Sequence, residues 1–582
     1  MIYSRNEHWY FLEEELKAQT EAYKQKLDTS ALFLLKEREE LFVAQFLKFQ
    51  EGEMILKFSN NRGLPRQGEY LYCFTVPKEL RNYKNWGDRT FGDLIKAKLN
   101  YSEVVCIWQA PSNEKNFSLV GFRGVELEFS TCIEKAEGQI FILGPNKPPF
   151  EYIVNLQGIV RNESNELLKR IFDQDFDFSD STPYYFGNKV NYVDFIFAQL
   201  ALQDNLIIEG PPGTGKTYLI AEICQKLCGQ GKSVLVTALT NRALIEIVEK
   251  PALKELLSEH QIFKTKLSVD EARAIKNLQE AKDLNPLPGK LILSTFYITS
   301  GQANQVKYEP PFDYVIVDEA SQALLGMFGG AVLLGRKNIW IGDTNQLPPV
   351  VALSDDRIQR GNYGALVDGF KALSENSTAP NFQLTETYRL TNRAANYTSL
   401  FYKNSLSSKT KKNNRVSYSE MSREYQKFFN PNGGPTLIRT YLDIGNLRPQ
   451  NALKITKNIV ENLLATEENL HISILTYFVE TTKALQRLIF QNFGYNKNIL
   501  VETVSRVQGL TTDVTIFVVP NTSYHRSLDK RLFNVATSRS KRHTLIITDH
   551  EILTHSKLDN EVREYLERLN DDFSFKINFE TD

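Results

Sequence analysis

The chain contains the glycine-rich stretch Gly210-Pro211-Pro212-Gly213-Thr214-Gly215-Lys216-Thr217, which joins the apolar run 206–208 to a helical pattern that begins at residue 218. This order of strand, loop and helix is the context in which such a loop binds a phosphate chain. Its backbone N–H groups and the helix N-terminus attract phosphate oxygens, Lys216 reaches the outer phosphates, and Thr217 ligates Mg²⁺. The sequence therefore predicts a nucleoside triphosphate site with Mg²⁺.

Two further segments carry side chains suited to phosphoryl transfer. Asp318 and Glu319 end the buried apolar strand expected at 315–317, where Asp318 suits a Mg²⁺ ligand and Glu319 suits the base that orients and deprotonates the attacking water. The apolar run 339–341 leads to Gln346, whose neutral amide suits a hydrogen bond to the terminal phosphate or to its water. We expect both segments beside the phosphate loop.

Short apolar strands alternate with helical patterns through the C-terminal two thirds of the chain, as in parallel α/β sheets. A first series of strands is expected at 206–208, 234–236, 291–293, 315–317 and 339–341. A second series is expected at 472–475, 514–518 and 544–547. Two α/β domains in tandem are therefore predicted.

The N-terminal third has a different character. Apolar residues recur at helical spacing between residues 7 and 36, which predicts a long amphipathic helix. From about residue 50 to 165, short β-rich runs such as 54–58, 70–74 and 104–108 are separated by turns, which favours a small antiparallel barrel.

Composition limits the kinds of partner. The net charge is −1, so any surface that binds a polyanion must be a local groove. Arg5, Glu7 and His8 interrupt the first twelve residues, and no later apolar run approaches a membrane span, so we predict a cytoplasmic protein without a membrane partner. The five cysteines are scattered, which predicts reduced thiols and no metal cluster.

The motifs together resemble the superfamily 1 helicases, and within them the Up-frameshift-like branch. The resemblance covers about residues 191 to 549 and includes six further segments in the family's order. These segments are 238–243, 294–295, 388–390, 476–477, 501–509 and 531–541.

The resemblance implies roles for individual residues. Tyr388 would stack on the adenine, while Arg389 and Arg539 would reach across the cleft to the γ-phosphate. Asp194 stands where the family usually has a glutamine that reads the adenine edge, and Thr511 stands where the branch typically has glutamate. A single-strand channel would be lined by Thr240, Asn241, Ser294, Thr295, Pro348, Thr476 and Thr503.

The expected fold is α/β, with two tandem RecA-like parallel-sheet motor domains, a helical stalk and a β-barrel accessory domain above the nucleic acid. The expected limits are 1–50 for the stalk, 51–170 for the barrel, 181–378 for motor domain 1, which binds ATP, and 379–582 for motor domain 2. The expected activity is ATP hydrolysis with Mg²⁺ that drives movement along single-stranded RNA or DNA, 5′ to 3′ by resemblance. Phosphate and stacking contacts serve both polymers, so the sequence does not choose between them.

Two other functions remain open at this point. One is an ATP-gated nucleic-acid clamp or nucleoprotein remodeller without processive unwinding, which would have a protein regulator as an additional partner. The other is a P-loop kinase or metabolic NTPase, which would not need Tyr388, Arg389 or Arg539 on a second domain.

Overall fold

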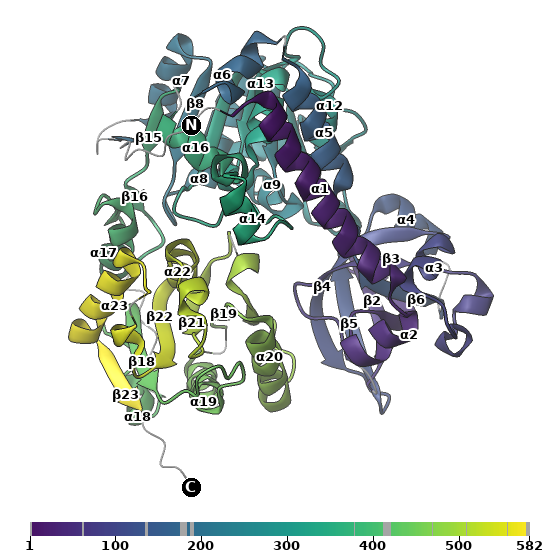
Figure 1. Cartoon of the computed structure of the whole chain (residues 1–582), viewed down its shortest axis with the longest axis vertical. Helices are drawn as coiled ribbons and strands as arrows, with labels where there is room; N and C mark the ends of the chain where they lie inside the picture. The colour runs from purple at the N-terminus through teal and green to yellow at the C-terminus, as the bar shows by residue number, and fades with distance from the viewer. Residues whose placement is uncertain are drawn as a thin grey trace.

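The computed structural model of the chain has three bodies, namely a barrel and two α/β domains (Figure 1). It describes residues 3–60, 63–133, 138–163, 165–174, 183–186, 191–376, 379–410, 421–467, 469–507, 509–555 and 557–577. Gln508, within the helicase-like segment 501–509, lies outside these residues. In the described part, no helix has both the length and the apolar composition needed to cross a membrane.

Six antiparallel strands close the barrel in the order β1-β2-β5-β4-β3-β6. Alternate residues of the strands point inward, which gives a core that includes Phe46, Leu56 and Phe122. The strands start at residue 42 and end at residue 145, earlier at both ends than the expected limits 51–170. They are β1 (Phe42–Gln50), β2 (Glu53–Ser59), β3 (Tyr70–Phe74), β4 (Tyr101–Pro111), β5 (Phe117–Arg123) and β6 (Ile140–Pro145).

Helix α1 (Arg5–Asp28) runs from the first α/β domain to the barrel and packs along α5 (Phe150–Arg161) (Figure 1). It begins with a capping box in which Ser4 and Glu7 satisfy each other's backbone N–H groups. The buried carboxylate of Glu15 accepts hydrogen bonds from the backbone N–H groups of Ala352 (2.8 Å) and Leu353 (3.0 Å). The helix is therefore fixed to the first α/β domain at the level of residues 352–353.

The first α/β domain has a parallel sheet in the order β11-β10-β12-β9-β13-β14-β8-β15-β7. All five strands expected from the sequence are present, as β8 (Asn205–Glu209), β9 (Val234–Ala238), β12 (Leu291–Thr295), β13 (Phe312–Val317) and β14 (Gly335–Gly342). The other four are β7 (Tyr184–Tyr185), β10 (Ile262–Thr265), β11 (Gln279–Ala281) and β15 (Asn381–Gln383). Strand β15 pairs with β8 and so belongs to the first sheet, although the sequence predicts that the second domain begins at residue 379.

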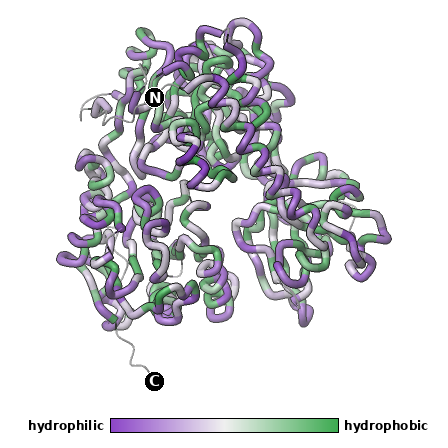
Figure 2. The backbone as a smooth tube through the Cα atoms, viewed as in Figure 1, coloured by the Kyte–Doolittle hydropathy of each residue, from purple (hydrophilic) through white to green (hydrophobic). Residues whose placement is uncertain are grey.

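The second α/β domain has a parallel sheet in the order β20-β19-β21-β22-β18-β23. The three expected strands are present as β19 (Ile472–Thr476), β21 (Thr512–Val518) and β22 (Ser540–Asp549). The remaining strands are β18 (Gly434–Thr440), β20 (Ile499–Thr503) and β23 (Ser574–Ile577). Figure 2 shows apolar stretches in the interior of both α/β domains and hydrophilic stretches over their surfaces.

Candidate ATP and nucleic-acid sites

The phosphate loop connects β8 to helix α8 (Lys216–Gly229), as the sequence predicts. Gly213 (φ 75°) and Gly215 (φ 86°) adopt left-handed backbone conformations, which turn the loop back toward the helix N-terminus. A Cβ atom at Gly213 would lie 2.4 Å from the Cβ of Arg389, so the loop is in close contact with the segment that follows β15. The ammonium group of Lys216 donates to the carbonyl of Gly210, and Thr217 lies in the first turn of α8.

Asp318 and Glu319 follow β13 at the same edge of the sheet. Asp318 is only 4% exposed, and its carboxylate accepts the backbone N–H of Glu319 at 2.8 Å. Burial and the negative charge of Glu319 raise the pKa of Asp318, while the ammonium of Lys216 opposes this shift. The buried Asp318 and the half-buried Glu319 beside one lysine have unbalanced negative charge, so this donor set fits Mg²⁺.

Gln346 follows β14 and is 5% exposed. Its amide donates to the carboxylate of Asp343 at 2.7 Å, and its carbonyl oxygen lies 3.5 Å from the guanidinium of Arg539, which comes from the second domain. Asp343 of the first domain and Arg539 of the second domain therefore both orient the Gln346 amide.

Arg389 and Arg539 lie close together between the two domains. Arg539 is 1% exposed and donates to the carbonyl of Val535 at 2.9 Å, while Arg389 donates to the carbonyl of Ser538 at 3.4 Å. Burial and the charge of Arg539 both lower the pKa of Arg389. Two confined positive charges favour an anion between them, so the pair fits a phosphate group.

Tyr388 lies on the phosphate loop, because its backbone N–H donates to the carbonyl of Gly213 at 2.9 Å, and its side chain is 59% exposed. Tyr192, at the start of α7 (Tyr192–Leu202), interacts electrostatically with Tyr388. The sequence does not mark Tyr192 as a site residue, although it stands two residues before Asp194.

Asp194 does not meet the phosphate loop. Its carboxylate pairs with the ammonium of Lys226 at 2.6 Å, and Lys226 is ten residues beyond Lys216 on helix α8. Ten helical residues span about 15 Å. Lys226 therefore holds Asp194 near the far end of α8, and a role for Asp194 at the nucleotide stays a prediction.

A polar network that the sequence did not indicate joins the two domains across the cleft. The hydroxyl of Tyr402 donates to the carboxylate of Asp343 at 2.8 Å, and the amide of Asn534 donates both to the Tyr402 oxygen and to the carbonyl of Asn345, each at 2.8 Å. Asp343 lies between the apolar run 339–341 and Gln346, and Asn534 lies in the segment 531–541, but nothing in the sequence marks Tyr402. The network connects the loop that carries Gln346 to helix α22 (Lys530–Thr537), which precedes Arg539.

We expect Tyr402→Phe to lower the rate of ATP hydrolysis about ten-fold, because a hydrogen bond to a charged group contributes about 1.5–3 kcal/mol and here holds the closed cleft. The measurement is kcat and KM for ATP at saturating nucleic acid. Tyr425→Phe is the matched control, since its oxygen accepts from Asn458 within the second domain at 2.9 Å. Equal rates for the two variants would contradict a role for the network in closure.

Glu209 provides a pH dependence at the base of the phosphate loop. Its carboxylate accepts hydrogen bonds from Asn381 (2.7 Å) and Thr344 (2.8 Å), and burial raises its pKa to about 7. A raised pKa means that the folded state binds the proton more tightly than the unfolded state. The resulting stability is present below pH 4.5 and is lost as the pH rises through about 7.

We therefore expect the unfolding temperature of the nucleotide-free protein to fall between pH 5.5 and 8.5, with a free-energy change of at most about 3 kcal/mol. Glu209→Gln should make this fall smaller, because the amide does not titrate, while the raised pKa of Asp318 leaves part of the fall in place. Thermal unfolding of both proteins across this pH range checks the prediction, and parallel pH curves would refute it.

The candidate nucleic-acid residues lie at or just after the carboxyl ends of β9, β12, β14, β19 and β20. Thr240 and Asn241 are exposed at the start of α9 (Asn241–Val248), and Pro348 is half-buried. Thr295 and Thr503 are nearly buried, while Ser294 and Thr476 are fully buried, so these last two side chains do not line an open channel in this conformation. Ser294 instead shares a hydrogen bond with Thr265 at 2.9 Å.

Comparison with known proteins agrees with this arrangement. Two AAA domain models match the chain, one over residues 196–352 and the other over residues 367–551. The DNA replication ATP-dependent helicase/nuclease DNA2 of Saccharomyces cerevisiae is 32% identical over 206 residues, which is 34% of this chain and 13% of that protein. An uncharacterised ATP-dependent helicase of Methanocaldococcus jannaschii is 22% identical over 480 residues, which is 64% of this chain and 70% of that protein.

The two AAA domain models fall on the two α/β domains, and both relatives are named as ATP-dependent helicases. The chain spans less than a fifth of the DNA2 proteins of yeast and human that it matches, with 13% and 18% covered. Among solved structures, an Arterivirus nonstructural protein 10 helicase has a TM-score of 0.37 at 12% identity over 87% of this chain and 76% of that one, a likeness too distant to add to the assignment.

Proposed function

We propose that the chain is an ATP-driven translocase that moves along single-stranded nucleic acid and unwinds duplexes it meets. The observation that carries the proposal is the cleft in which Arg389 and Arg539 face the phosphate loop, Glu319 and Gln346 of the first domain. A site divided between two α/β domains makes ATP binding and domain closure one event.

In this proposal, the backbone of the phosphate loop and Lys216 bind the triphosphate, and Tyr388 and Tyr192 hold the adenine. Thr217 and Asp318 would hold Mg²⁺, which supplies charge neutralisation between the phosphates.

In the hydrolysis step, Glu319 accepts a proton from the attacking water, which Gln346 orients. Arg389 and Arg539 stabilise the charge that develops on the transferred phosphoryl group. Loss of the phosphate removes the anion between the two arginines, and the domains part.

The proposed track lies at the carboxyl edges of the two sheets. Thr240 and Asn241 begin α9 on the first domain, and Thr503 ends β20 on the second, so relative motion of the domains changes the spacing of their contacts with a strand. Several relatives are named as DNA replication proteins, which favours DNA as the track. The motif order favours the Up-frameshift-like branch and, with it, movement from 5′ to 3′.

A displacement assay tests direction and processive movement together. Streptavidin bound to one end of a single-stranded oligonucleotide should be released in the presence of ATP when it is at the 3′ end, and retained when it is at the 5′ end. Release from the 5′ end alone would reverse the proposed polarity. ATP turnover with release from neither end would favour an ATP-gated clamp instead.

A further inference from the structure

The outer face of the barrel strands β3 and β4 carries several tyrosines. Tyr72 and Tyr101 stack on each other, with ring centroids 5.0 Å apart. Tyr70 begins β3 on the same face, two residues before Tyr72, and is 60% exposed. A single exposed tyrosine is ordinary on a protein surface, so its surroundings decide whether it has a role.

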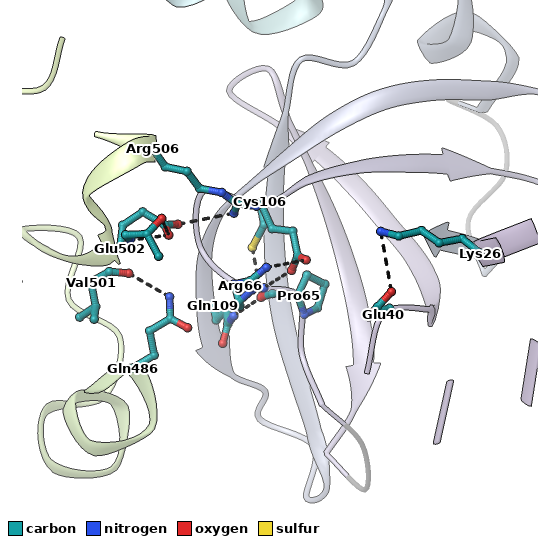
Figure 3. A network of polar contacts seen from close by, with 12 residues as sticks. Lys26, Glu40, Pro65, Arg66, Cys106, Gln109, Gln486, Val501, Glu502 and Arg506 are labelled. Atoms are coloured by element: carbon teal, nitrogen blue, oxygen red, sulfur yellow. Dashed lines mark hydrogen bonds and ion pairs between the residues drawn. The ribbon is translucent and has the colours of Figure 1, made fainter. Parts of the chain in front are cut away.

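The start of β3 lies against the second α/β domain. A Cβ atom at Gly68 would lie 3.1 Å from a carboxylate oxygen of Glu502, at the end of β20. Glu502 is ion-paired with Arg506 at 3.7 Å. Figure 3 shows Glu502 and Arg506 facing the barrel beside Arg66. Tyr70, two residues after Gly68, is therefore close to the segment that follows Thr503.

Two more contacts join the barrel to the second domain. The rings of Trp108 and Tyr495 are 6.0 Å apart, and Glu39 pairs with Arg487 at 3.7 Å. These contacts lie outside the expected nucleic-acid segments, and they place the barrel and the second domain side by side.

The barrel also contacts the first α/β domain beyond helix α1. The backbone N–H of Gly124 donates to the carboxylate of Asp270 at 2.9 Å, and the N–H of Val269 donates to the carbonyl of Val125 at 3.0 Å. The barrel thus contacts both α/β domains.

Tyr70 is close to side chains of both α/β domains. Arg242 of the first domain and Arg506 of the second both act electrostatically on its hydroxyl, and burial raises its pKa although the side chain is exposed to water. Tyr297 of the first domain is 39% exposed and interacts electrostatically with Tyr70, and burial raises its pKa to about 12. Both rings are therefore accessible to solvent and at the same time surrounded by protein.

Each neighbour of Tyr70 comes directly after a segment that is expected to hold a single strand. Arg242 follows Thr240 and Asn241, Tyr297 is two residues after Thr295, and Arg506 is three residues after Thr503. Three segments distant in sequence thus each bring an aromatic or cationic side chain close to one barrel residue; in the second segment the intervening Phe296 is buried.

We propose that Tyr70 and Tyr297 form a base-stacking subsite for a single strand, with Arg242 and Arg506 on the adjacent phosphates. This inference rests on the proposed function, because it needs a strand between the three bodies. Aromatic faces stack on any base, so the subsite holds the strand without reading its sequence. Arg242 is largely exposed in its ion pair with Glu246, so exchange of that carboxylate for a phosphate costs little. Arg506 is 42% exposed, while its partner Glu502 is buried and also accepts the backbone N–H of Thr503 at 2.7 Å.

The test measures the affinity of the full chain for single-stranded DNA and RNA by fluorescence anisotropy, with intact oligonucleotides and with otherwise identical abasic ones. Tyr70→Ala and Tyr297→Ala should each weaken binding of the intact strand about ten-fold, within the range of one stacked base. Tyr70→Phe should bind as the wild type does. Tyr308→Ala is the control, because Tyr308 is 86% exposed in the loop before β13, at the opposite edge of the sheet.

The abasic strand separates stacking from a structural effect. Wild type and Tyr70→Ala should bind it equally, since it offers phosphates and no bases. Equal binding of the intact strand by wild type, Tyr70→Ala and Tyr297→Ala would overturn the subsite and leave the proposed function in place. Failure of the wild type to bind either polymer would overturn both.

Discussion

Replacing Glu319 by glutamine is expected to leave ATP binding nearly unchanged and to slow hydrolysis by about 10²- to 10⁴-fold, the usual contribution of a positioned general base. Glutamine keeps the size of the side chain and its hydrogen-bonding oxygen, but it does not accept a proton from water. Glu319 has a left-handed backbone (φ 50°) at the end of β13 and interacts with the charge of Arg539. Removing the Glu319 carboxylate should therefore change the rate of hydrolysis more than the affinity for ATP.

Two measurements on the same protein check this expectation, the affinity for ATP by calorimetry and the steady-state turnover. The matched control is Glu222→Gln, an exposed glutamate on the same helix as Lys216, which should hydrolyse ATP at the wild-type rate. Near-normal turnover by Glu319→Gln would show that another group is the base.

Replacing Arg539 by alanine is expected to lower ATP turnover by about 10³- to 10⁵-fold, as for other arginines that complete a phosphoryl-transfer site from a neighbouring domain. The side chain is 1% exposed, and the carbonyls of Val535 (2.9 Å) and Leu510 (3.5 Å) fix its direction toward Gln346. Lysine keeps the positive charge but lacks the planar guanidinium with its several N–H donors. Arg539→Lys should therefore hydrolyse ATP only slightly faster than Arg539→Ala.

Because Arg539 is buried, the unfolding temperature of each variant must be measured with its turnover. Arg542→Lys is the control, since Arg542 lies three residues away on β22 and pairs with Glu467 outside the cleft, at 2.6 Å. A stable Arg539→Ala protein that hydrolyses ATP at the wild-type rate would show that Arg539 of the second domain does not contribute to hydrolysis.

The central elements of the fold were predictable from the sequence because they depend on local patterns. Buried parallel strands are continuous apolar runs, and all eight expected in the two α/β domains are present. The phosphate loop, Asp318 and Gln346 each follow such a strand, so their meeting at one edge of the sheet follows from parallel topology. The order of strands in the sheets was not predictable, because it depends on contacts distant in sequence.

Other features depend on packing that no local pattern records. Strand β15 has only three residues, so its pairing with β8 left no periodic signal at the expected domain limit. The sequence around Tyr402 indicates only a core aromatic residue. Its polar partners Asp343 and Asn534 are distant in sequence and meet it only in the folded chain. Asp194 has the expected position in sequence, but its ion pair with Lys226 directs it elsewhere.

The most direct test of the ATP-driven motor is the rate of ATP hydrolysis by the purified chain with no nucleic acid, with single-stranded DNA and with single-stranded RNA. Lys216→Ala, which removes the ammonium group from the phosphate loop, is the control. The proposal predicts strong stimulation, larger with DNA than with RNA, that is absent in Lys216→Ala. Turnover that depends on Lys216 but is indifferent to both polymers would contradict it.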